Sequence, residues 1–129
     1  YALQEELEEN SNDPSVQKYY SAFSGLRTQI YNNPANNWSI PALADSLALS
    51  LSYFQHLYKQ FFTCSCQQDI ISARLELAKY YLTGSDMSIR SLSDFCGYDN
   101  ELHFMRQFKK FVGMTPTEYR QKCAFIHRA

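Results

Sequence analysis

The sequence lacks several features that would identify other classes of protein. It has no apolar run near the roughly 18 residues that a membrane-spanning helix needs, so we expect a soluble protein with no membrane partner. Its start does not resemble a signal peptide, and it begins at Tyr1 rather than methionine, so we expect a piece of a longer polypeptide. The 45% hydrophobic and 16% aromatic residues exclude a disordered segment. A length of 129 residues suits one compact unit or two very small ones.

Motifs of catalysis and cofactor binding are also missing. The sequence contains no glycine-rich phosphate loop, no pair of carboxylates in an apolar setting and no nucleophile beside a base. His56 and Cys64 are close in sequence but fall on different predicted elements, so they are weak evidence for catalysis. We therefore predict that the chain is not an enzyme and holds no cofactor.

The four cysteines do not form the framework of a small secreted domain. Cys64 and Cys66 are separated by one residue, which is too close for an easy mutual disulfide. With the three histidines they show neither the C-x₂-C nor the H-x₃-H spacing of zinc sites. We interpret them as structural thiols of a cytoplasmic protein, in preference to metal or redox chemistry.

The charges are unevenly distributed, although the net charge is only −1. Five of the 13 acidic residues lie in residues 1–13, which contain no Lys or Arg, and residues 14–129 therefore carry a net charge of +4. We interpret residues 1–13 as an acidic linker from a missing upstream domain, with a dimerising helix through Leu3 and Leu7 as the alternative. The mildly basic remainder permits a nucleic-acid partner but does not by itself indicate one.

Helix signals are dense, whereas strand signals are nearly absent. Apolar residues recur three and four apart, and polar capping residues precede each stripe. The predicted starts are Asp13, Ser39, Ser50, Ser65, Ser88, Asp99 or Asn100, and Thr115. The predicted buried faces of two helices are formed by Phe54, Leu57, Tyr58 and Phe61, and by Phe104, Phe108 and Phe111. These signals predict an all-α fold of about seven helices.

Two stretches of the chain resemble each other. At an offset of 49, Ser39, Ile40, Leu43, Asp45, Ala48 and Leu49 fall on Ser88, Ile89, Leu92, Asp94, Gly97 and Tyr98. At an offset of 50, Phe54, Tyr58, Lys59, Phe61 and Ser65 fall on Phe104, Phe108, Lys109, Phe111 and Thr115. The extra residue falls between the two helices of the unit, where a turn can absorb it.

Both copies show a short helix, a tight turn and a longer helix, which is the helix-turn-helix plan. A tandem of ordinary helical hairpins is the alternative, but a solenoid normally needs three or more repeats. The predicted helix Cys66–Leu82 between the copies spans roughly 25 Å at 1.5 Å per residue. With its flanking turns, this spacer suits two recognition helices about one duplex turn apart, or roughly 34 Å.

Two segments closely resemble the signature of AraC/XylS-type transcription regulators: Gly97–Lys110 (GYDNELHFMRQFKK) and Gly113–Arg120 (GMTPTEYR). Trp38–Ile40, Ser50–Phe54 and Arg74–Lys79 fit the upstream half of the pattern, and the resemblance covers about residues 22–123. It implies two helix-turn-helix subdomains joined by a long linker helix, at residues 14–83 and 84–129. It also implies sequence-specific binding of double-stranded DNA, and a structural or backbone-supporting role for Arg74.

The sequence departs from the family pattern at three positions. Thr63 stands where glycine commonly follows the first recognition helix, so we expect a different helix ending there. Leu102 replaces a small polar residue, which either loses a hydrogen bond to DNA or substitutes an apolar contact with a thymine methyl group. His56 stands where arginine is usual, so its electrostatic contribution depends on pH.

Base contacts need donors and acceptors on the outer faces of the two recognition helices, and phosphate contacts need cations or free N–H groups. The predicted base contacts are Ser52, Gln55, His56, Glu101, Leu102, Met105 and Arg106. The predicted phosphate contacts are Ser39, Lys59, Ser88, Arg90, His103, Lys109, Lys110 and Thr115. A half-buried structural role for His103 and a merely solvated face for Lys109 and Lys110 are the alternatives.

The implied partners follow from the same resemblance. We expect the fragment to bind DNA as a monomer, and the full-length protein to dimerise, respond to a small molecule and contact RNA polymerase. The alternative function is a helical protein-interaction module that binds a partner through Leu102 and Met105. Salt separates the two functions, because DNA binding weakens steeply as salt rises.

Overall fold

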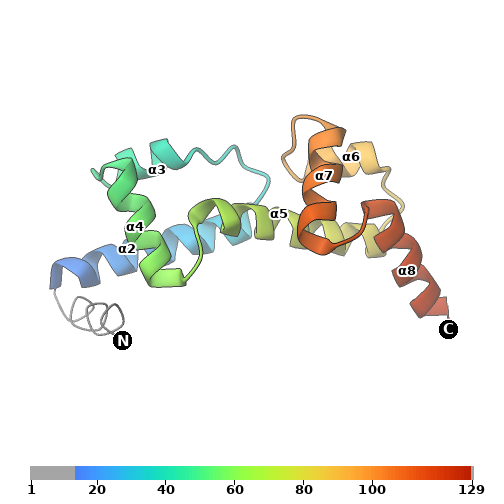
Figure 1. Ribbon diagram of the computed structural model, residues 1–129, viewed down its shortest axis with the longest axis horizontal. Helices are drawn as coiled ribbons and strands as arrows, with labels where there is room; N and C mark the ends of the chain where they lie inside the picture. The colour runs from blue at the N-terminus through green and yellow to red at the C-terminus, as the bar shows by residue number, and fades with distance from the viewer. Residues whose placement is uncertain (1–13, 129) are drawn as a thin grey trace. The chain divides into compact units, whose positions relative to one another are not determined.

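A computed structural model describes residues 14–128, with side chains described from Val16 to Cys123. This part of the chain forms seven helices and no strand, which confirms the predicted all-α fold (Figure 1). The helices are α2 (Pro14–Asn32), α3 (Ile40–Ser46), α4 (Leu51–Phe62), α5 (Cys66–Gly84), α6 (Ile89–Phe95), α7 (Glu101–Val112) and α8 (Pro116–Arg128). Within the described residues, no helix has the length and apolar character needed to cross a membrane. The predicted acidic linker and the Asp13 cap lie outside these residues.

The chain divides into two compact units. Unit 1 contains the described residues up to Asn33 together with Trp38–Ile70, and unit 2 contains Pro34–Asn37 together with the described residues from Ile71 onward. Helix α5 begins in unit 1 and continues into unit 2. The predicted subdomains at residues 14–83 and 84–129 stay a prediction, because the two compact units are defined by packing and not by function.

Side-chain caps begin the helices at the predicted residues. The cap oxygen accepts a hydrogen bond from the backbone N–H three residues later, at 3.4 Å for Ser39, 3.2 Å for Ser50, 3.0 Å for Ser88 and 2.7 Å for Asn100. Ser65 and Gln68 form the predicted capping box, with exchanged side-chain to backbone bonds of 2.9 and 3.1 Å. Each cap satisfies a first-turn N–H group that has no partner inside its helix.

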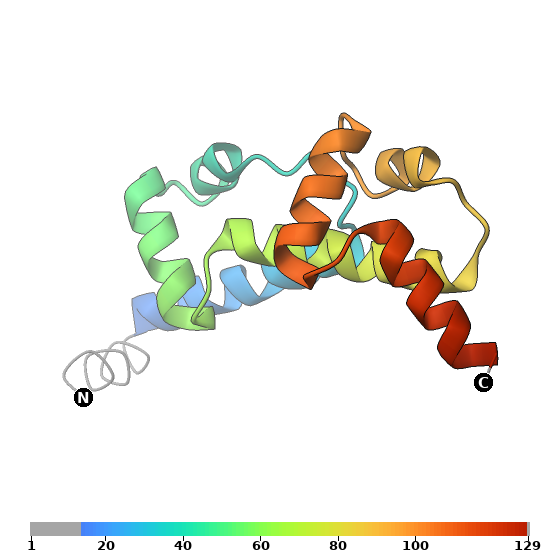
Figure 2. The same ribbon diagram turned by 45° about the vertical axis from the view of Figure 1, so that its right-hand side comes forward.

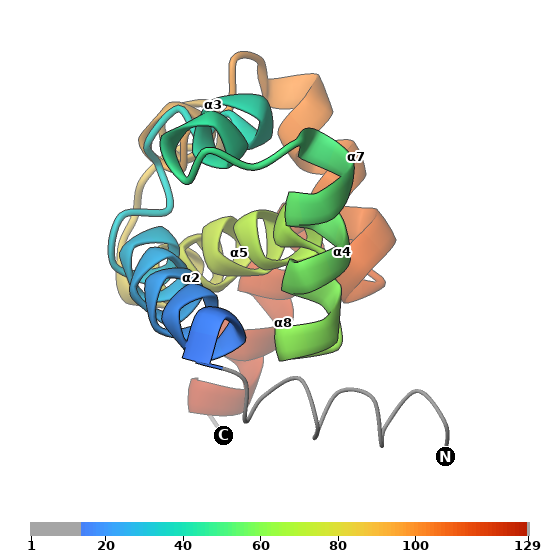
Figure 3. The same ribbon diagram turned by 90° about the vertical axis from the view of Figure 1, so that its left-hand side faces the viewer.

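An aromatic core holds unit 1 together, and Figure 3 shows the backbone of its helices α2, α3 and α4. Phe23 of α2 stacks on Phe54 of α4 at 5.0 Å between ring centroids and meets Phe61 edge-on at 5.3 Å. The buried apolar residues of this unit are Phe23, Ile30, Ala44, Phe54, Leu57, Tyr58, Cys66 and Ile70. They come from α2, α3, α4 and the start of α5, so the core holds α4 by its buried face.

The core of unit 2 is apolar: its buried residues come from α5, α6, α7 and the turn between α6 and α7, and Tyr119 of α8 packs against them. Figure 2 shows the backbone of these helices. The principal buried cluster of unit 2 is Ile71, Leu75, Ala78, Leu82, Leu92, Cys96, Tyr98, Phe104 and Phe108. The predicted core position of Phe111 is wrong, because 47% of this residue is exposed. A step of four from Phe104 and Phe108 leads to Val112, which packs against the cluster in its place.

Backbone anchors support the second helix-turn-helix. The Arg74 guanidinium donates to the carbonyl oxygens of Pro34 and Asn36, both at 3.0 Å, which confirms its predicted structural role. Gly97 lies beside this segment with φ +93°, and a Cβ atom on it would be 2.7 Å from the Ala35 carbonyl oxygen. Only glycine fits both the left-handed backbone and this close approach.

Candidate nucleic-acid interface

Each unit contains one short helix followed by one longer helix with matching ends. Helix α4 ends at Thr63 and α7 ends at Gly113, both with left-handed backbone at φ 62° and 93°. The cap N–H groups donate to the Lys59 and Lys109 carbonyl oxygens, at 2.8 and 2.9 Å. The expected difference in helix ending at Thr63 is therefore wrong, since threonine adopts the conformation that glycine adopts in the second copy.

Helix α4 presents all of its predicted contact residues on one exposed face. Ser52, Gln55, His56 and Lys59 are exposed, whereas Phe54, Leu57 and Tyr58 are buried on the opposite face. Tyr53 on this helix is 43% exposed, and its ring stacks beside His56 at 6.5 Å between centroids. The face thus combines hydrogen-bonding groups with an aromatic ring.

Helix α7 presents its predicted contacts in the same way, with one exception. Glu101, Leu102 and Arg106 are exposed, and Leu102 and Arg106 lie one helical turn apart. Met105 is half-buried and packs against the core, so only part of it is open to a ligand. The side chains of Lys109 and Lys110 are exposed near the end of the helix.

The two recognition helices differ in charge. Helix α4 contains one cation, Lys59, whereas α7 contains Arg106, Lys109 and Lys110 against the single carboxylate of Glu101. Two arginines elsewhere are occupied by backbone or carboxylate: Arg27 binds Asp69, and Arg120 donates to the Leu82 carbonyl oxygen at 2.9 Å. The exposed positive charge of the recognition helices is therefore concentrated on α7.

The predicted phosphate contacts at helix starts have few free donors. Ser39, Ser88 and Thr115 use their side chains as caps, and the Ala42, Ser91 and Glu118 N–H groups are bound by them. Pro41 and Pro116 carry no N–H group, which leaves fewer donors at α3 and α8 than at α6. At α6 the exposed Arg90 adds a cation to the first turn.

His103 is exposed in the first turn of α7, and so the half-buried position considered for it is wrong. Its backbone N–H donates to Asn100 Oδ1, and its ring meets Tyr98 edge-on at 5.4 Å. Buried beside it, the Tyr98 hydroxyl donates to the Gln107 side chain. The Tyr98 contacts hold the start and the middle of the recognition helix against the core.

A buried carboxylate links three helices of unit 1. Asp69 is 3% exposed and accepts hydrogen bonds from Arg27 Nε at 2.8 Å, the Tyr58 hydroxyl at 2.6 Å and the Tyr31 hydroxyl at 2.9 Å. Burial by itself raises the pKa of Asp69, but the bonds from Arg27, Tyr58 and Tyr31 outweigh it, so the net pKa lies below the usual value. Sequence reasoning missed this cluster. The available signal was the internal repeat: at the offset of 50, Asp69 corresponds to the aromatic Tyr119, so the two copies differ in charge at this position.

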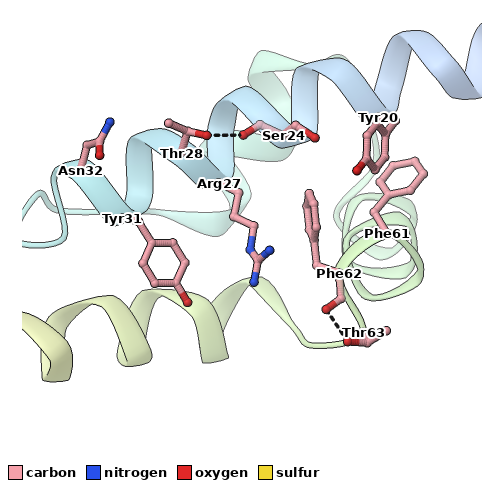
Figure 4. A pocket seen from close by; sticks show the side chains of 9 residues that line it. All are labelled: Tyr20, Ser24, Arg27, Thr28, Tyr31, Asn32, Phe61, Phe62 and Thr63. Atoms are coloured by element: carbon pink, nitrogen blue, oxygen red, sulfur yellow. Dashed lines mark hydrogen bonds between the residues drawn. The ribbon is translucent and has the colours of Figure 1, made fainter.

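A cavity of about 750 Å³ lies on unit 1 beside this cluster (Figure 4). The Arg27 guanidinium lies over the Phe62 ring at 4.8 Å, with Tyr31 on its other side at 5.7 Å. Arg27 lines the cavity, but its positive charge is neutralised by the ion pair with Asp69. The aromatic rings of the cavity stabilise the junction of α2 and α4.

Two of the four cysteines, Cys66 and Cys96, are buried, and Cys64 and Cys123 are half-buried. All four are free thiols, and burial raises the pKa of Cys66 and of Cys96 to about 12, which keeps both protonated. Among the described residues, no group of three or more His, Cys, Asp or Glu side chains is placed to hold a metal ion.

Comparisons with known proteins agree with this geometry. A family model described as a helix-turn-helix domain matches residues 43–122. The transcriptional regulator GadX of Escherichia coli strain K12 is 31% identical over 97 residues, which cover 75% of this chain and 35% of that protein. The arabinose operon regulatory protein of the same strain is 33% identical over 88 residues, which cover 68% of this chain and 30% of that protein. This chain thus spans about a third of the length of these relatives.

Solved structures show the same fold. The DNA-binding domain of the transcriptional factor AdpA, solved in complex with a target DNA, has a TM-score of 0.72 at 19% identity. The match covers 78% of this chain and 90% of that domain. With the family model covering most of the chain and the paired short and long helices repeated in both units, the chain belongs to the family of AraC-type helix-turn-helix domains.

Proposed function

We propose that this chain is the DNA-binding part of a transcription regulator and reads double-stranded DNA with α4 and α7 in two major grooves. The observation that carries the proposal is that each unit fixes a longer helix by its apolar face and exposes polar side chains on the other face. A helix of this kind fits the major groove, where side chains reach the edges of bases. GadX and the arabinose operon protein are regulators by name, and the AdpA domain was solved with its target DNA.

The residue roles divide into base and phosphate contacts. We assign base contacts to Ser52, Gln55, His56, Glu101, Leu102, Met105 and Arg106. We assign phosphate contacts to Ser39, Lys59, Ser88, Arg90, His103, Lys109, Lys110 and Thr115. Arg106 is the strongest member, because an exposed arginine in mid-helix can bind guanine through two hydrogen bonds. At Ser39 and Thr115 the contact would be made by the remaining backbone N–H groups, since both side chains serve as caps.

Family membership confirms that the chain is not an enzyme. The other properties of the full-length protein remain proposals: contact with RNA polymerase, dimerisation, and a cytoplasmic location. We propose that the chain alone binds as a monomer, because two recognition helices supply two half-sites without a second copy.

Selection of bound duplexes from a random library tests this function, followed by a salt titration on the enriched sequence. We expect two short enriched blocks about 10 base pairs apart and an affinity that falls steeply as salt rises. An absence of enrichment at low salt would contradict DNA binding and favour a helical protein-interaction module. One enriched block would contradict base reading by both helices.

A further inference from the structure

Three exposed side chains in the first half of α7 offer three different base chemistries. Glu101 is a hydrogen-bond acceptor, Leu102 is apolar, and Arg106 is a fork of donors one turn further along. The equivalent positions of α4, at an offset of 50, hold Leu51, Ser52 and His56. The combination of acceptor, apolar contact and arginine fork is therefore a property of unit 2 and not of the repeat.

Leu102 is placed to meet a ligand and not the core. It is 56% exposed, whereas Phe104 and Phe108 bury the opposite face of the same helix. The first residues of a recognition helix are the ones that contact base edges. Arg106, Lys109 and Lys110 lie one to two turns further along the same helix and give it positive charge, which suits DNA better than an apolar protein surface.

The major-groove edges of pyrimidines decide what this combination recognises. Thymine presents a 5-methyl group beside an oxygen acceptor, and cytosine presents an amino donor without a methyl group. Leucine gains from the methyl group, while a carboxylate accepts from the amino group and is repelled by the oxygen. One base satisfies both side chains at once, because 5-methylcytosine carries the methyl group and the amino group together.

We propose that α7 reads 5-methylcytosine, so that this chain binds its DNA site more tightly when a cytosine is methylated at C5. Leu102 contacts the methyl group, Glu101 accepts from the amino group, and Arg106 binds a neighbouring guanine. The proposal rests on the DNA-binding function above and adds a base modification to it. It also gives the exposed Leu102 a role, because a helix that binds unmodified cytosine needs no apolar side chain at this position.

Glu101 has a structural role that must be separated from base reading. It lies in the first turn of α7, where a negative charge stabilises the helix through its dipole. That role affects the affinity for every duplex equally. The ratio of the affinities for cytosine and thymine at one position separates the two roles, because helix stabilisation does not change this ratio.

The experiment uses the duplex enriched by selection and the block whose preference changes in Arg106→Ala. Each pyrimidine of that block is tested in matched pairs: 5-methylcytosine against cytosine, and thymine against uracil. At one cytosine we expect methylation to raise the affinity about fourfold, the equivalent of burying one methyl group. At the same position we expect 5-methylcytosine to bind about tenfold better than thymine.

Variants assign the two effects to their residues. Leu102→Ala and Leu102→Ser, the latter matching Ser52 of the first copy, are expected to remove the methyl gain. Glu101→Gln is expected to keep the gain and lose the preference over thymine. The proposal is overturned if no cytosine in the block gains from methylation, if the gain survives in Leu102→Ala, or if thymine binds better than 5-methylcytosine. Failure to bind any duplex contradicts the DNA-binding function itself, whereas binding without a methyl effect contradicts only this inference.

Discussion

Units 1 and 2 build the same helix-turn-helix with different residues at equivalent positions. Two backbone positions are left-handed in both copies. Unit 1 places Ala48 and Thr63 there, at φ 55° and 62°, and unit 2 places Gly97 and Gly113 there, both at φ 93°. A non-glycine residue in this conformation costs roughly 1–2 kcal/mol of stability. Ala48 and Thr63 nevertheless adopt it, so the packing of the unit determines the backbone here more strongly than the residue type does.

The centres of the two units differ as well. In unit 1 the Tyr58 hydroxyl donates to the buried Asp69, whereas the equivalent residues of unit 2, Phe108 and Tyr119, make a ring contact at 5.6 Å. A carboxylate fixes its partners by directional hydrogen bonds, and an aromatic pair fixes them by shape. Equivalent recognition helices are thus held by different physical means.

The largest expected effect is on the polar centre of unit 1. Asp69→Ala removes the acceptor of Arg27, Tyr31 and Tyr58, and we expect it to lower the free energy of unfolding by about 3–4 kcal/mol. This value lies toward the lower end for a broken buried pair, because the Arg27 side chain is partly exposed. Denaturant unfolding measures the loss. A loss below about 1 kcal/mol would show that the cluster contributes little to unit 1.

Acid gives a second measure of the same residue. Hydrogen bonds keep the pKa of Asp69 below its usual value in the folded chain, so its contribution is present above the unfolded pKa, near 4. It is lost as the pH falls through the lower folded pKa. We expect the wild type to lose stability more steeply than Asp69→Asn below about pH 4. Parallel curves would contradict the lowered pKa.

The next effect separates backbone strain from steric contact in unit 2. Gly97→Ala places a Cβ atom 2.7 Å from the Ala35 carbonyl oxygen, and we expect a loss of about 2–3 kcal/mol. Gly113→Ala is the matched control, because it has the same φ and, in the described part of the chain, no atom within 4 Å of the added Cβ. We expect about 1 kcal/mol there, from the backbone alone. Equal losses in thermal unfolding would show that the approach to Ala35 relaxes without cost.

A smaller effect concerns a buried hydroxyl. Ser93 is fully buried and its Oγ has no hydrogen-bond partner among the described residues, while the equivalent residue of unit 1 is the buried Ala44. We expect Ser93→Ala to stabilise the chain by about 1 kcal/mol, because an unsatisfied polar atom is removed. The reverse change, Ala44→Ser, is expected to destabilise it by a similar amount. If calorimetry shows Ser93→Ala to be destabilising, the hydroxyl has a partner.

The smallest effect concerns the end of α4. Thr63→Gly relieves the left-handed backbone but increases the freedom of the unfolded chain, so we expect a net gain of about 0.5 kcal/mol. Gly113→Thr, at the equivalent end of α7, is expected to lose about 1 kcal/mol. Opposite signs in denaturant unfolding would sharpen the comparison, whereas two losses would show that Thr63 is favoured for another reason.

The local features of the fold are predictable from the sequence, since capping residues and apolar spacing act within one or two turns. Ser39, Ser50 and Ser88 begin their helices as predicted for this reason. Phe111 and Asp69 were missed because their burial depends on packing between helices, which spacing along one helix does not determine. The outer faces of α4 and α7 were predictable as the complement of the apolar faces. The half-burial of Met105 was not, since it depends on how deeply α7 lies in its unit.

The measurement that most directly tests whether α4 and α7 contact separate half-sites compares the DNA affinity of two variants on two scrambled duplexes. Affinities of the wild type, Gln55→Ala and Arg106→Ala are measured on the enriched duplex and on duplexes with either block scrambled. We predict that Gln55→Ala loses sensitivity to one block only and Arg106→Ala to the other only, each at a cost of roughly 1–3 kcal/mol on the intact site. If both variants change preference within the same block, or if both weaken all duplexes equally, α4 and α7 do not read separate half-sites.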